Sequence, residues 1–121
     1  MRARLLAIGA SLGLVLAATA AMAHPKLTSS VPAADGAATA TKEIRLNFSE
    51  GVIAKFSGLE LQDASGKLIA TGTATTDAKD RKQLVVPLEA PLAAGKYRVI
   101  WHAVSEDTHR VKGEYTFIIG N

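Results

Sequence analysis

The sequence contains no cysteine, so no disulfide can stabilise this chain and no thiolate can bind a metal. Its two methionines, Met1 and Met22, both lie near the N-terminus. The remainder of the chain therefore has no sulfur ligand of either kind. Because soft sulfur ligands favour Cu(I), a metal bound beyond Met22 would depend on nitrogen and oxygen atoms.

No segment reaches the roughly 20 consecutive apolar residues of a confident transmembrane helix. The longest apolar stretch, residues 5–21, follows Arg2 and Arg4 and ends in the small-residue pattern Ala-Met-Ala at 21–23. This is the pattern of a secretory signal peptide. We therefore predict that residues 1–23 are cleaved and that residues 24–121 form a single domain exported to the periplasm. The leader has no cysteine, so we expect no lipid or other membrane anchor.

Charge gives little reason to expect a nucleic-acid partner. Without Arg2 and Arg4, the 14 basic residues fall to 12, against 11 acidic residues. The exported domain is thus almost neutral in its side-chain charge, and its sequence contains no run of Lys and Arg. Nucleic acids and anionic membranes are normally recognised by such runs.

Alternation of apolar and polar residues predicts β-strands. It is clear in residues 44–48 and 97–101, and again in a final strand at 113–119. Residues 63–66 read as a hairpin turn. Altogether we count about seven short strands, with turn signals every 8–12 residues, and no amphipathic helix. This pattern predicts an all-β sandwich.

Three residues of the exported domain suggest a metal site. Cleavage after Ala23 would give His24 a free α-amine beside its imidazole, which together form a chelate. Asp107 and His109 are two residues apart in a polar loop, so in extended backbone their side chains would point the same way. Three nitrogens and one oxygen are typical ligands of tetragonal Cu(II) or Ni(II). Zinc more often takes a tetrahedral site with two or three histidines.

Ordinary explanations remain open for each of these residues. His24 could follow the cleavage site by chance, and the Asp-x-His pair could be a solvated turn. His102 is out of phase with the predicted core positions of its strand, which favours a surface histidine over a fourth ligand. Pro25 has no N–H, so the backbone nitrogen after His24 cannot deprotonate and bind the metal. Any further ligand must then come from elsewhere in the fold.

The residues also resemble a known family, the periplasmic copper-binding proteins of the CopC type. The resemblance covers the whole predicted domain and is carried by residues 24–27, 30–36, 46–50, 95–101, 104–109 and 113–117. It implies an immunoglobulin-like Greek-key β-sandwich or barrel that binds one Cu(II) through His24, Asp107 and His109. It also places Glu50 close to the copper, where a carboxylate could hydrogen-bond to a ligand.

The resemblance further implies a role in copper resistance, with an inner-membrane copper-transport protein as partner, and we expect a monomer. Longer members of the family carry a methionine-rich Cu(I) site at the other end of the barrel. Since the predicted domain has no methionine, we expect a Cu(II) site alone.

Two other functions remain as alternatives. A histidine brace, made of an N-terminal histidine and a second histidine, is the copper site of polysaccharide monooxygenases, which are also β-sandwiches. The chain is short for such an enzyme and shows no aromatic platform for a glycan. An Asp ligand would also leave little room for oxygen, so we do not expect an enzyme. The second alternative is a structural domain without metal.

Overall fold

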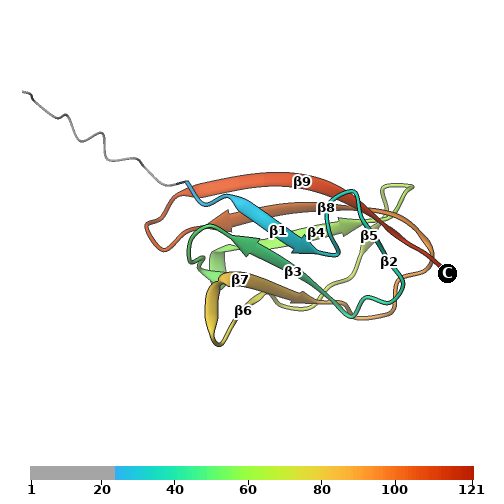
Figure 1. The fold of residues 1–121 in the computed structure, drawn as a ribbon, viewed down its shortest axis with the longest axis horizontal. Helices are drawn as coiled ribbons and strands as arrows, with labels where there is room; N and C mark the ends of the chain where they lie inside the picture. Colours follow the sequence, from blue (N-terminus) through green and yellow to red (C-terminus); the bar gives the residue numbers. More distant parts are fainter. Residues whose placement is uncertain (1–23) are drawn as a thin grey trace, which may run out of the picture.

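The computed structural model describes residues 24–121, and the predicted signal peptide lies outside them (Figure 1). Nine strands and one short 3-10 helix follow one another along this part of the chain. The strands are β1 (Leu27–Val31), β2 (Ala37–Ala38), β3 (Glu43–Phe48), β4 (Gly58–Gln62), β5 (Leu68–Ile69), β6 (Thr75–Asp77), β7 (Asp80–Pro87), β8 (Gly95–Val104) and β9 (Arg110–Ile119). The 3-10 helix, η1 (Ala54–Phe56), precedes β4.

The strands form two sheets. One has the order β1-β3-β7-β6, and the other has the order β2-β9-β8-β4-β5. All pairs are antiparallel except β2 with β9. The predicted all-β sandwich is therefore confirmed. Nine strands replace the predicted seven, and two of them, β2 and β5, have only two residues each. Such short segments are too brief for alternation to reveal.

The core lies between the sheets and follows the predicted alternation. In β3 every second residue, Ile44, Leu46 and Phe48, is buried. Phe48 meets Trp101 of β8 edge to face, with 5.4 Å between ring centroids, and so joins the two sheets. Along β8, Tyr97 and Val99 are also buried, whereas His102 is exposed as predicted. No helix in the described part of the chain is long and apolar enough to cross a membrane.

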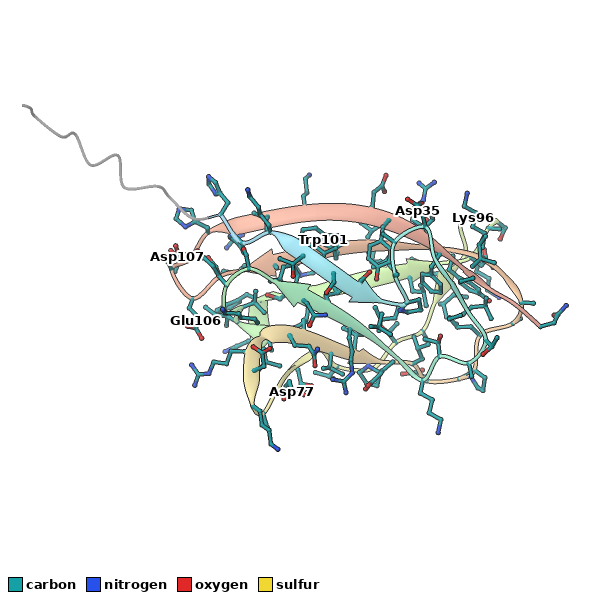
Figure 2. The ribbon with its side chains drawn as sticks, viewed as in Figure 1. Asp35, Asp77, Lys96, Trp101, Glu106 and Asp107 are labelled. Carbon is teal, nitrogen blue, oxygen red and sulfur yellow. The ribbon has the colours of Figure 1, made fainter. Side chains whose placement is uncertain are left out.

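Three segments meet at one end of the sandwich. The β8–β9 hairpin turns there through residues 105–109, and Glu106 N–H donates to the Gly51 carbonyl at 3.0 Å. The start of the described chain is held beside the end of β3, because Ser49 N–H donates to the Lys26 carbonyl at 2.8 Å. Figure 2 shows Glu106 and Asp107 at this end, and Asp35 and Lys96 at the opposite end. The fold thus brings residues near 24, 50 and 107 together.

Candidate metal centre

The loop that joins β8 to β9 is closed by its own backbone. Ser105 N–H donates to the His109 carbonyl at 2.9 Å, and Thr108 N–H donates to the Ser105 carbonyl at 2.8 Å. Thr108 has a φ of 72°, in the left-handed region that non-glycine residues rarely adopt. This turn returns the chain sharply and leaves Asp107 and His109 on either side of Thr108.

Asp107 and His109 lie close together as predicted, but they meet across a turn with a left-handed Thr108 and not in the extended backbone that the prediction assumed. Oδ2 of Asp107 is 2.9 Å from Nδ1 of His109, and the two side chains are 50% and 24% exposed. Although the distance is short, the alignment is not that of a hydrogen bond, so Nδ1 is a buried polar atom without a hydrogen-bond partner. An atom of this kind in a native fold calls for an explanation, and a role as a metal ligand is one.

Ser105 holds both of these residues. Its side chain is fully buried, and its hydroxyl donates to Oδ1 of Asp107. The same hydroxyl oxygen accepts the backbone N–H of His109 at 3.2 Å. The hydrogen bond from Ser105, and to a smaller extent the contact with His109, lowers the pKa of Asp107 below its usual value. Asp107 is therefore ionised, with Oδ1 occupied and Oδ2 directed to His109.

His24 approaches the same loop from the start of the described chain. Its ring stands nearly perpendicular to that of His109, at 78°, with 5.2 Å between centroids. The backbone beside it is fixed, because Lys26 N–H donates to Oγ of Ser49 at 2.9 Å and Pro25 is buried. The structure thus brings together all three predicted ligands: His24, Asp107 and His109.

The side chains of His24, Asp107 and His109 do not by themselves form a complete set of metal ligands. In residues 24–121, no three His, Cys, Asp or Glu side chains are grouped closely enough to hold a metal as they stand. The fourth predicted donor is the α-amine of His24, which in the uncleaved sequence is an amide bonded to Ala23. The predicted donor set therefore requires cleavage of the bond after Ala23.

The Asp107–His109 pair nevertheless suits a tetragonal ion. Nitrogen and oxygen ligands of divalent first-row metals bind at about 2.0–2.2 Å, so two of them at a right angle are about 2.9 Å apart. The observed separation of Nδ1 and Oδ2 is 2.9 Å. The pair thus has the spacing of two neighbouring ligands around one metal.

Glu50 and His102 occupy different positions. Glu50 is half-buried just after β3, and its carboxylate makes no hydrogen bond or ion pair within the described part of the chain. The carboxylate that contacts this turn is that of Glu106, which fills the space over Gly51 and pairs with Arg81 at 3.2 Å. His102 lies on the outer face of its sheet, over Gly58. It is not grouped with the predicted ligands.

The role of Ser105 was not predicted from the sequence. A signal for it was present, because the buried alternation of residues 97, 99, 101 and 103 continues to position 105. A hydroxyl at an inward-facing position must find hydrogen-bond partners. Here the partners are the two predicted ligands that follow it. The contact of Glu106 with Gly51 had no comparable signal, since it joins residues from different sheets.

Comparison with known proteins agrees with this architecture. The model of the CopC domain family matches residues 27–120. Copper resistance protein C of Escherichia coli is 45% identical over 114 residues, which cover 88% of this chain and 90% of that protein. Copper resistance protein C of Pseudomonas syringae pv. tomato is 39% identical over 108 residues, covering 85% and 86%.

Solved structures match as well. PcoC, a methionine-rich copper resistance protein from Escherichia coli, is 46% identical with a TM-score of 0.73, covering 81% of this chain and all of that one. CopC from Methylosinus trichosporium OB3b is 31% identical with the same TM-score, covering 79% and 93%. Both fold and sequence are shared along nearly all of residues 24–121, and the chain therefore belongs to the CopC family.

Proposed function

We propose that this protein is a periplasmic copper-binding protein that serves copper resistance and homeostasis. Several relatives that it matches are copper resistance proteins, and these matches span nearly the whole of the described domain. The protein binds one Cu(II) per chain as a monomer, buffers it, and exchanges it with an inner-membrane copper-transport protein. The predicted signal peptide directs export of the domain, and its removal creates the site by freeing the α-amine of His24.

Four donors make up the proposed site. His24 supplies its α-amine and imidazole, Asp107 supplies Oδ2, and His109 supplies an imidazole nitrogen. The observation that carries the proposal is the buried Nδ1 of His109, which lies 2.9 Å from Oδ2 of the ionised Asp107 without an aligned hydrogen bond. A carboxylate oxygen and an imidazole nitrogen at this spacing suit a divalent cation. We also propose Glu50 as a hydrogen-bonding partner of a ligand. It is half-buried just after β3, at the same end of the sandwich as the proposed site.

The donor set also favours one oxidation state. PcoC is described as methionine-rich, whereas residues 24–121 of this chain contain no methionine and no cysteine. Nitrogen and oxygen ligands in a tetragonal arrangement stabilise Cu(II), and soft sulfur ligands stabilise Cu(I). We therefore propose a Cu(II) site with no Cu(I) site in the same domain. The proposed role is to bind and release the ion, not to catalyse a reaction on it.

Equilibrium dialysis of residues 24–121 against Cu(II) tests this function. We expect one tightly bound ion per chain, and loss of that ion in His109→Ala. His102→Ala is the matched control, since it removes another histidine of the same hairpin that lies outside the proposed site. Copper binding that survives His109→Ala, or that is lost equally in His102→Ala, would contradict the proposed ligands.

A further inference from the structure

A groove lies on the five-stranded sheet beside the metal centre. Its volume is about 520 Å³, and its lining residues are Phe56, His102, Ala103, Val104, Arg110, Val111 and Lys112. In the register of β8 and β9, His102 stands opposite Lys112 and Val104 stands opposite Arg110. The second of these is the last pair before the loop that carries Asp107 and His109. The groove therefore begins directly next to the proposed copper site.

Positively charged side chains line and flank this groove. Arg110 and Lys112 line it, Lys55 flanks it, and no acidic side chain is among the lining residues. Within residues 24–121, Arg110 differs from the other arginines, because it forms no ion pair with a carboxylate. The arginines that do form such pairs are Arg45, Arg81 and Arg98. Three cations are thus left for a partner to neutralise.

An exposed aromatic ring completes the surface. Phe56 is 53% exposed, although it is among the largest apolar residues of the domain. Nζ of Lys55 lies 5.8 Å from the centre of its ring, so a cation and an apolar face are presented together. His102 packs over Gly58, where an added Cβ would lie 3.4 Å from its Cε1. Aromatic residues and arginine are the residue types enriched at protein–protein interfaces.

We infer that this groove docks an acidic segment of a partner protein, with an apolar side chain of that segment packed against Phe56 and Val104. Carboxylates of the segment would pair with Lys55, Arg110 and Lys112. A membrane surface fits less well, because the domain is almost neutral with 12 basic and 11 acidic residues, and each basic residue near an anionic membrane contributes only about 1 kcal/mol. The position of the groove brings such a partner next to His109.

Nuclear magnetic resonance on the copper-free domain tests this inference without relying on the copper site. The probe is a pentapeptide with a central leucine flanked by two glutamates and two aspartates, and its counterpart carries four lysines instead. We expect the acidic peptide to shift the amide signals of residues 102–104 and 110–112 saturably. The lysine peptide should leave these signals in place.

Charge reversal then tests the residues that carry the inference. Lys112→Glu should weaken binding of the acidic peptide about tenfold, because it replaces an attraction with a repulsion. Lys96→Glu is the matched control, since it makes the same charge change in the same sheet, at the opposite end of β8. Phe56→Ala should weaken binding without altering the net charge.

Three results would overturn the inference. In the first, both peptides shift the same signals equally. In the second, Lys96→Glu weakens binding as much as Lys112→Glu does. In the third, the acidic peptide does not bind, while vesicles with phosphatidylglycerol bind the protein through Lys112, which would assign the surface to a membrane instead.

Discussion

Nδ1 of His109 lies 2.9 Å from Oδ2 of Asp107, yet the two atoms make no aligned hydrogen bond. Thr108, with its left-handed φ of 72°, sets this relationship by turning the chain between the two residues. The consequence is a pair of donors spaced like neighbouring ligands of one ion. Because the loop is closed by its own hydrogen bonds, the loop itself holds this half of the proposed site together.

Replacing Ser105 tests whether the hydrogen bonds that hold Asp107 and His109 matter for the site. Ser105→Ala removes the hydroxyl that donates to Asp107 and accepts from His109. We expect the free energy of unfolding to fall by about 1–2 kcal/mol, because the part-buried backbone N–H of His109 loses its partner. Copper affinity should fall about tenfold, as is usual when a group that orients a metal ligand is removed. Urea unfolding and a competition titration with a copper chelator would measure the two effects.

Ser65→Ala provides the control for that experiment. Ser65 makes the same type of contact, donating its hydroxyl to Oδ1 of Asp63 at 2.6 Å in the turn between β4 and β5. This turn is remote in sequence from the proposed ligands and exposed to solvent. Copper affinity should therefore be unchanged in Ser65→Ala. An equal loss in both variants would mean that Ser105 has no particular role in the site.

Acidification should release copper well before it protonates Asp107. The α-amine and the imidazoles must lose protons to bind a metal, so affinity should fall steadily from pH 7 to pH 5. Asp107 stays ionised over that range, because its pKa lies below the usual value of 3.8. A chelator titration at several pH values would measure this. A flat affinity between pH 7 and pH 5 would exclude nitrogen ligands.

Stability should respond to acid in a lower range of pH. The pKa of Asp107 is lower in the folded protein than in the unfolded chain, so its contribution is present above about pH 3.8. It is lost as the pH falls through the folded-state value. Thermal unfolding of the copper-free domain should thus show a smaller loss of stability below pH 4 in Asp107→Asn than in the unaltered domain. An identical acid dependence of both proteins would contradict the lowered pKa.

Gly113 is required for the hairpin that carries the site. It stands opposite Trp101 in the β8–β9 register, and a Cβ there would lie 2.6 Å from Cζ2 of the indole. Gly113→Ala should therefore lower the free energy of unfolding by about 1–3 kcal/mol, as overpacking does. Gly120→Ala is the control, because its nearest atom would be 4.0 Å away. Similar stability of the two variants in urea would show that Trp101 moves aside freely.

Much of this fold was predictable from local patterns. The alternation in β3 and β8 identified the buried faces correctly, and it placed His102 outside. The two-residue strands β2 and β5 were not predictable, because pairing with distant strands defines them and their own sequence does not. Local patterning records which face of a strand is buried, but not which strands become neighbours.

The candidate site was predictable in part for the same reason. The spacing of Asp107 and His109 suggested that they would meet, and the structure brings them to 2.9 Å. The proximity of His24 depends on the pairing of β1 with β3, which no local signal revealed. The contact of Glu106 with Gly51 depends on how the sheets stack. The role of Glu50 as a hydrogen-bonding partner of a ligand stays a prediction.

The most direct test of the account is Cu(II) electron paramagnetic resonance on residues 24–121, compared with the same domain carrying one alanine before His24. The added residue moves the free amine away from the His24 imidazole and leaves every side chain in place. We expect one tetragonal signal per chain in the first protein, and an altered, weaker-binding signal in the second. Identical spectra and stoichiometry in both proteins, or no stoichiometric copper in either, would contradict the proposed site.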